Sequence, residues 1–370
     1  MLEFHIMLEF DTQNINLGLG RVQTVLTKLG NPQDKFKSIL VAGTNPVIWV
    51  EGVMCHLQSE HLSDSDIANC FLPLLSAEQR TRLDKVGDVD FSIGKAGVGR
   101  MRINLHRQRG TLSAATRFIP HAIPTFDSLK LPPRIREFAD LPHGMVLVTG
   151  GAATGKSTTL ASLVDYISHT YAYHIITLED PVEFMFPHDK SVIEQRQIGQ
   201  DSESFASALR HIVRQRPDVV LVGEMRDLET ISAALTAAEI GHLVLASLHT
   251  SNAVETINRI IDIFPGSQQT QIRVQLAGTL QGVVCQTLFR DEIDGGLAPA
   301  VEIMIPNAAI RRAIRDNETH LITGMIETGR NTGMQTMDVA IAQLVAEGRV
   351  NLADGLAKAQ NPEKLARMVG

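Results

Sequence analysis

Hydrophobic positions follow two different patterns along the chain, and the change falls near residue 120. In the first part, apolar and polar residues alternate from Met101 to Leu105, which predicts a strand with one buried face. Two further strands are expected at Pro46–Val50 and Val89–Ile93. A helix is expected between them, because a cluster of capping residues precedes apolar positions at helical spacing. The first part therefore predicts a mixed α+β domain.

After residue 140, short and uniformly apolar runs alternate with longer stretches that have helical spacing. Such runs predict strands buried on both faces, as parallel strands between two layers of helices are. The runs are Met145–Thr149, Ile175–Leu178, Val219–Gly223 and Leu243–Leu248. Strands that alternate with helices predict a doubly wound α/β domain. Beyond about residue 300 the pattern is mostly helical.

Chain breakers separate the two patterns. They are Pro120, Pro124, Pro132 and Pro133. We therefore expect a linker between the domains. The predicted organisation is an N-terminal domain over residues 1–120, a linker over 121–140, an α/β core over 141–300 and a helical C-terminal extension over 301–370.

Composition narrows the function classes. The chain has 370 residues, of which 44% are hydrophobic, so it can bury a sizeable core and is not a disordered chain. Its formal net charge of −7 argues against a general nucleic-acid binder, and no nucleic-acid partner is expected. No apolar run is long enough to predict a membrane span. The three cysteines lie far apart in the sequence and the N-terminus has no export signal, so we expect the protein to be located in the cytoplasm.

A phosphate-binding loop follows the first apolar strand of the α/β part. Gly150-Gly151-Ala152-Ala153-Thr154-Gly155-Lys156-Ser157 fits G-x-x-x-x-G-K-[ST], with a strand before it and a helix after it. Backbone N–H groups of such a loop surround phosphate oxygens at a helix N-terminus. Lys156 is expected to bind the β- and γ-phosphates, and the Ser157 hydroxyl is expected to bind Mg²⁺. The predicted cofactors are therefore ATP and Mg²⁺.

Carboxylates follow two further strands. Glu224 ends the apolar run Val219–Gly223, where it could hold Mg²⁺ through water, act as a general base, or merely cap the next helix. Glu179, Asp180 and Glu183 follow the strand before it. Clustered acids repel one another unless a cation lies among them, and this favours a metal-facing role over a solvated loop.

Two histidines bracket the last predicted parallel strand. His242 precedes Leu243–Leu248 and His249 follows it. In a phosphate-loop enzyme, an imidazole at the end of such a strand can sense the γ-phosphate. The alternative for either residue is a histidine that only satisfies the core or a helix end.

These motifs, in this order, resemble the secretion ATPase superfamily and, within it, the retraction motors of type IV pili. Two further segments continue the resemblance, Asn258–Pro265 and Ala309–Asp316, which is similar to the C-terminal helix signature of retraction motors. The resemblance covers about residues 86–350. The first 85 residues match poorly.

The resemblance implies a PAS-like N-terminal domain followed by a RecA-like phosphate-loop domain, assembled as a homohexamer with ATP between the domains. It implies an inner-membrane pilus platform protein as partner, other pilus motor ATPases as further partners, and a peripheral location at that membrane. It also implies three sets of site residues. The catalytic set is Glu224, Glu179 and His249, and the magnesium set is Ser157, Glu179 and Glu224. The nucleotide-binding set is Gly150, Gly151, Ala152, Ala153, Thr154, Gly155, Lys156, Ser157, Thr158, Asp180, Glu183, His242, and Arg102 and Arg117 of the N-terminal domain.

One departure and several alternatives bear on this interpretation. Ala153 stands where the family has glycine, and a positive φ there would cost alanine about 1 kcal/mol. A poorly hydrolysing ATP-binding scaffold therefore stays open as an alternative function.

An assembly motor or a type II secretion ATPase usually carries a tetracysteine module, which the cysteine positions exclude. A type IVB secretion ATPase of the same shape stays open as an alternative, and the feature that favours a retraction motor over it is the Ala309–Asp316 helix. A nucleic-acid translocase would need a basic channel or stacking aromatics, and the negative net charge argues against this alternative.

Overall fold

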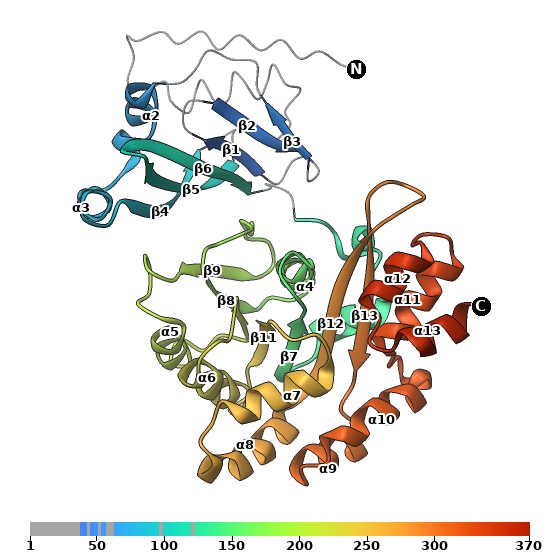
Figure 1. The fold of residues 1–370 in the computed structure, drawn as a ribbon. Coiled ribbons are helices and arrows are strands. Elements are labelled where there is room, and N and C mark those ends of the chain that lie inside the picture. The colour runs from blue at the N-terminus through green and yellow to red at the C-terminus, as the bar shows by residue number, and fades with distance from the viewer. Residues whose placement is uncertain (1–37, 43–44, 51–52, 57–62, 96–98, 120–122) are drawn as a thin grey trace. The chain divides into compact units, whose positions relative to one another are not determined.

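The chain forms two compact units, each built around its own sheet. The computed structural model describes residues 38–42, 45–50, 53–56, 63–95, 99–119 and 123–370. The units are Met1–Ala122 and Ile123–Gly370 (Figure 1). Among the described residues, no helix has both the length and the apolar character needed to cross a membrane.

The first unit contains a six-stranded antiparallel sheet in the order β3-β2-β1-β6-β5-β4. Its strands are β1 (Ser38–Ala42), β2 (Asn45–Val50), β3 (Val53–His56), β4 (Asp88–Lys95), β5 (Gly99–Gln108) and β6 (Thr111–Ile119). Its helices are α2 (Asp64–Phe71), η2 (Leu72–Leu74) and α3 (Ala77–Val86). Capping boxes at Ser63 and Ser76 begin the two α-helices.

The alternation predicted for β5 is confirmed. Met101, Ile103 and Leu105 are buried, and they pack with Ile67 of α2 and Leu83 of α3. The opposite face of β5 is polar and partly exposed. Helices therefore cover one face of the β4–β6 part of this sheet, and the other face is left to charged side chains.

The second unit contains a seven-stranded sheet in the order β13-β12-β7-β11-β10-β8-β9. Neighbouring strands are parallel except for the antiparallel β12–β13 pair. The strands are β7 (Gly144–Thr149), β8 (His174–Glu179), β9 (Val192–Gln197), β10 (Val219–Val222), β11 (Leu243–Leu248), β12 (Leu280–Arg290) and β13 (Leu297–Met304). The four predicted apolar runs are confirmed as buried parallel strands, whereas β9, β12 and β13 were not predicted.

Helices cover both faces of this sheet, so the α/β class is confirmed (Figure 1). Alternate residues of β7 face opposite ways: Val146 and Val148 pack towards α4 (Lys156–Thr170), and Met145 and Leu147 pack towards the other layer. The other layer includes α5 (Phe205–Ile212), α6 (Leu228–Glu239), α7 (Ala253–Asp262) and α8 (Gly266–Thr279).

The segment predicted to be a linker is part of this core. Residues 123–140 form η3 (Phe126–Leu129) and η4 (Pro133–Asp140), and Phe126, Ile135 and Phe138 are buried against α4 and the sheet. The prolines therefore produce two short 3₁₀ helices rather than a free connection, because the apolar residues between them pack on the sheet.

The C-terminal residues are mostly helical, as predicted, and they pack on the same core as the sheet. They form α9 (Ala308–Arg315), η5 (Thr319–Leu321), α10 (Ile322–Thr328), η6 (Arg330–Thr332), α11 (Met337–Ala346), α12 (Leu352–Lys358) and α13 (Pro362–Val369). In α9, Ile310, Ala313 and Ile314 are buried, as helical spacing predicts, but Ala309 is exposed.

Arg311 of α9 is a capping residue for the preceding helix. Its Nη1 donates to the carbonyl oxygens of Ala277 and Gly278, and its Nη2 donates to Gln281 Oε1 at 3.0 Å. These carbonyls belong to the last turn of α8, which has no intrahelical partner for them. The neighbouring Arg312 is exposed and pairs with Asp316, the exposed residue that ends the same helix.

We predict that Arg311→Ala lowers the free energy of unfolding by about 1–3 kcal/mol, because it leaves partly buried carbonyls without a charged donor. The matched Arg312→Ala variant removes a solvent-screened pair and is expected to change stability much less. Denaturant midpoints of the two variants check this. Equal midpoints would mean that the contacts at the end of α8 contribute nothing measurable.

Candidate functional site

The loop between β7 and α4 has the geometry of a phosphate-binding loop. Gly150 and Gly155 have φ values of 145° and 86°, which favour glycine. Space requires glycine as well: a Cβ on Gly150 would lie 2.3 Å from the Gln286 carbonyl oxygen, and one on Gly155 would lie 2.9 Å from Gln286 Nε2. The two glycines thus let the loop turn tightly against β12 before α4 begins at Lys156.

The Lys156 side chain points back under this loop. Its Nζ donates to the carbonyl oxygens of Gly150 at 2.9 Å and Gly151 at 2.6 Å. The residue is only 8% exposed, and burial lowers the pKa of its ammonium group, while the charge of Glu183 opposes that shift. A buried ammonium held by backbone carbonyls keeps its charge available for an anion that enters the site.

Ala153 adopts the left-handed backbone conformation, in which alanine is less favourable than the glycine that the family has at this position. Its φ is 59°, a region that favours glycine over alanine. The loop therefore carries backbone strain of about 1 kcal/mol at one of its turns. Thr154, the next residue, donates from Oγ1 to the Gly151 carbonyl oxygen at 3.1 Å, so it stabilises the loop internally.

Gln286 of β12 supports the loop, and it was missed in the sequence. Its Oε1 accepts a hydrogen bond from Thr159 Oγ1 of α4 at 2.8 Å, while its backbone carbonyl and its amide lie against the two loop glycines. It is 5% exposed. The available signal was a pair of polar residues, Gln286 and Thr287, inside the otherwise apolar run Val283–Phe289.

The three acids after β8 lie beside the loop, but they differ in environment. Glu179 is buried; it accepts hydrogen bonds from Thr177 Oγ1 at 2.7 Å, Gln195 Nε2 at 3.1 Å and Glu183 N at 3.3 Å. Burial raises the pKa of Glu179, and these donors oppose the shift. Asp180 and Glu183 are exposed at the edge. Glu179 is therefore arranged to shape the acidic turn rather than to offer free oxygen ligands.

Glu224 and His249 face each other across the ends of β10 and β11. Glu224 Oε1 lies 3.5 Å from His249 Nε2 and also pairs with Arg226 Nε. Burial lowers the pKa of His249, and the positive charges of Lys156 and Arg226 lower it further, so its imidazole is neutral at pH 7. Arg226, which is mostly exposed, was not among the predicted site residues.

A cavity of about 260 Å³ joins these groups. Its lining includes Ala152, Ala153, Lys156, Ser157, Glu179, Asp180, Glu183, Glu224, Arg226 and His249. Five residues of the predicted nucleotide-binding set in the segment 150–158 are not among the lining residues: Gly150, Gly151, Thr154, Gly155 and Thr158. Among the described residues, no three His, Cys, Asp or Glu side chains form a ready metal cluster. Mg²⁺ bound with a nucleotide takes most of its ligands from phosphates and water, so the Ser157 hydroxyl and Glu224 fit such an ion.

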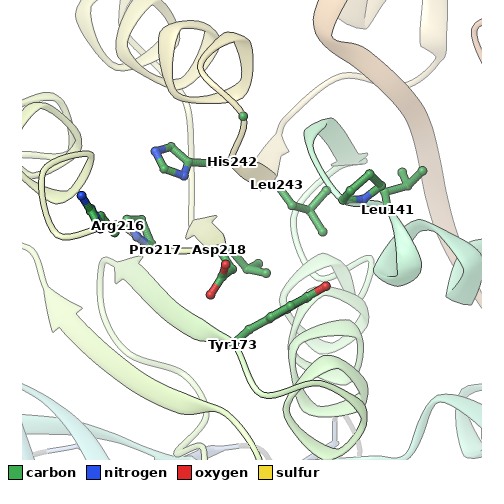
Figure 2. A pocket seen from close by; sticks show the side chains of 10 residues that line it. Leu141, Tyr173, Arg216, Pro217, Asp218, His242 and Leu243 are labelled. Atoms are coloured by element: carbon green, nitrogen blue, oxygen red, sulfur yellow. The ribbon is translucent and has the colours of Figure 1, made fainter.

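His242, which the resemblance implied as a nucleotide ligand, lies at the amino end of β11 and does not line this cavity. The six residues of β11 separate it from His249 by about 20 Å of extended chain. It lines a different pocket, of about 300 Å³, together with Tyr173, Arg216 and Asp218. Figure 2 shows these side chains around the pocket at the amino ends of the strands.

Arg102 and Arg117 lie in the first unit, directly opposite each other on β5 and β6. Arg102 Nε is 3.9 Å from Asp90 Oδ1, and both side chains are about half exposed. Like charges opposite each other on paired strands are destabilising unless an anion joins them. Their position on the polar face of the sheet therefore provides a basic pair suited to an anion.

Comparisons with known proteins agree with this geometry. The family model of the type II/IV secretion system proteins matches residues 128–359. The type IV pilus retraction ATPase PilT of Pseudomonas aeruginosa is 40% identical over 88% of this chain and 94% of its own. A twitching motility protein of Neisseria gonorrhoeae is 40% identical over 88% of this chain and 87% of its own.

A solved structure is similar over nearly the whole chain. The crystal structure of the pilus retraction motor PilT with bound ADP is 41% identical, with a TM-score of 0.85 over 92% of this chain and 98% of that one. The similarity thus extends beyond the phosphate loop to both units and to the C-terminal helices. The chain belongs to the type II/IV secretion system protein family.

Proposed function

We propose that this chain is the subunit of a hexameric ATPase that powers retraction of type IV pili. The observation that supports it most is the cavity that joins Lys156, Glu224 and His249, in a chain similar over most of its length to retraction motors. In this proposal, the first unit is the PAS-like domain and the second is the RecA-like domain. The partners are an inner-membrane platform protein and other pilus motor ATPases, with the ring at the cytoplasmic side of that membrane.

The first step is capture of the triphosphate by the loop. The Lys156 ammonium exchanges its bonds to the Gly150 and Gly151 carbonyls for bonds to phosphate oxygens, which carry more negative charge. Backbone N–H groups at the start of α4 bind the same phosphates. Mg²⁺, held by Ser157 and through water by Glu224, would neutralise charge on the phosphates.

The second step is attack by water. Glu224 Oε1 is positioned to accept a proton from a water molecule in the cavity once Arg226 moves from it to the phosphates. The neutral His249 at 3.5 Å keeps this carboxylate in place and can donate a hydrogen bond to it. In this proposal, Arg102 and Arg117 are further phosphate ligands, because a basic pair on the polar face of a sheet suits an anion.

We predict different defects for two substitutions. Lys156→Ala removes the charge that binds phosphate and is expected to weaken Mg-ATP binding at least about tenfold. Glu224→Gln keeps the shape of the side chain but removes the base, so it should bind normally and lose about 100-fold or more in turnover. Titration calorimetry and phosphate release check both. Equal loss of binding in the two variants would contradict these roles.

The strain at Ala153 gives a further prediction. Ala153→Gly removes an unfavourable φ of 59° that is already present in the free loop, so we expect the loop to be stabilised by up to about 1 kcal/mol, with Mg-ATP affinity and turnover at least as high. Ala152→Gly is the matched control, because Ala152 is not among the described residues with positive φ. If both variants weaken binding alike, the loop gains nothing from glycine. A wild type whose turnover does not exceed that of Glu224→Gln would instead support a non-hydrolysing scaffold.

The cellular role is tested by deletion of the gene. Cells without this protein are expected to carry many pili and to lose surface motility, because pili are made but not withdrawn. Complementation with the wild-type gene should restore motility, and complementation with Glu224→Gln should not. Bald cells would show an assembly motor instead, and unchanged pili and motility would exclude a role in this machinery.

A further inference from the structure

A buried carboxyl group outside the cavity joins three segments of the second unit. Glu302 of β13 is 2% exposed. Its Oε1 accepts a hydrogen bond from the backbone N–H of Ala253 at 2.7 Å, and its Oε2 lies 3.4 Å from Met337 N and 3.3 Å from Gln360 Nε2. Ala253 begins α7, Met337 begins α11, and Gln360 lies between α12 and α13.

The place of Glu302 in the sheet connects it to the functional loops. In the strand register, Glu302 lies opposite Cys285 of β12, Cys285 lies beside Thr149 of β7, and Thr149 lies beside Leu248 of β11. Thr149 directly precedes the phosphate loop, and Leu248 directly precedes His249. Glu302 therefore lies in the row of residues from which both functional loops start.

The connection from His249 to Ala253 is short and firmly bonded. Thr250 Oγ1 lies 2.7 Å from Thr256 Oγ1, and Thr256 Oγ1 in turn donates to the Asn252 carbonyl oxygen at 2.7 Å. Asn252 also caps α7. Because three bonded residues separate His249 from the first helical residue, the position of the α7 N-terminus determines where the imidazole lies.

Donor groups approach both carboxyl oxygens of Glu302, so both oxygens must act as acceptors. Every group that approaches it is a donor: two backbone N–H groups at helix N-termini, the Gln360 amide and the Cys285 thiol. The partial positive charge of the two helix ends also favours a carboxylate there. A glutamine would keep one acceptor, but its NH₂ group would face a donor at the other position.

We propose that Glu302 is a positioning residue for hydrolysis: it fixes the N-terminus of α7 and thereby holds His249 against Glu224. The inference rests on the proposed ATPase function. Glu302 does not line the cavity, so its role in the reaction is indirect. This role accounts for a buried carboxyl group in the mostly apolar strand β13.

The test compares Glu302→Gln with a matched control in the purified full-length protein. Glu302→Gln is expected to lower kcat about tenfold and to leave the KM for Mg-ATP within about twofold, because only the alignment of His249 changes. The control is Asp338→Asn. Asp338 Oδ1 and Oδ2 accept from Gln360 N and Asn361 N but do not contact α7. This control should lower the melting temperature and keep kcat.

A double variant separates positioning from general packing. In a His249→Ala background, Glu302→Gln should cause no further loss of kcat, because its effect passes through His249. Additive losses, an unchanged kcat in Glu302→Gln, or an equal kcat loss in Asp338→Asn would each overturn the inference. If Glu302→Gln does not fold, Glu302→Asp tests the same contact, because it keeps the charge and shortens the reach to Ala253. A wild-type protein without ATP hydrolysis would refute the proposed function instead.

Discussion

The site depends on the bonds between the buried Lys156 ammonium group and the backbone carbonyls of its own loop. Lys156 is enclosed by its own loop and bonded to two backbone carbonyls, and charged groups are costly to bury without a strong partner. A phosphate oxygen is a better acceptor than a carbonyl. The Lys156 ammonium therefore binds a phosphate oxygen in preference to the loop carbonyls. The glycines and Gln286 matter because they keep the loop in the one shape that leaves the ammonium in this position.

The parallel sheet decides what can reach that charge. The carboxyl ends of β7, β8, β10 and β11 lie next to one another, so the segments that follow these strands reach the same cavity. Lys156, Glu179, Glu224 and His249 are brought together from across a long stretch of sequence in this way. Binding sites at the carboxyl ends of the strands are the rule for open α/β sheets. The residue row that ends in Glu302 extends the same geometry to the C-terminal helices.

Much of this site could be predicted, because local patterns determine it. The apolar runs fix the strands, and the spacing of Gly150, Gly155 and Lys156 fixes the loop. The strain at Ala153 followed from one unusual residue in that loop. Gln286 was missed because its role depends on which strands become neighbours. Arg226 was missed for a different reason: it pairs with Glu224, two residues before it, and the predicted motif gave it no role. His242 does not line the cavity for a related reason: the two histidines are close in sequence, but β11 places them at opposite ends of the strand.

Long-range packing also explains the errors at the domain level. Residues 123–140 contain breakers typical of a linker, yet their aromatic side chains meet a sheet face that only the folded unit presents. The contact of Arg311 with the end of α8 was not predicted either. Neither contact can be predicted from the local sequence, because the contacting segment lies far along the chain in each case.

The most direct test of the central claim is the position of the Lys156 ammonium in a structure of the full-length protein with a magnesium-bound, non-hydrolysable ATP analogue. The structure should show Nζ within hydrogen-bonding distance of the β- and γ-phosphates, no longer bonded to the carbonyls of Gly150 and Gly151, and Glu224 facing the terminal phosphate. A nucleotide bound elsewhere, or a loop that keeps its lysine on those carbonyls at saturating analogue, would contradict it.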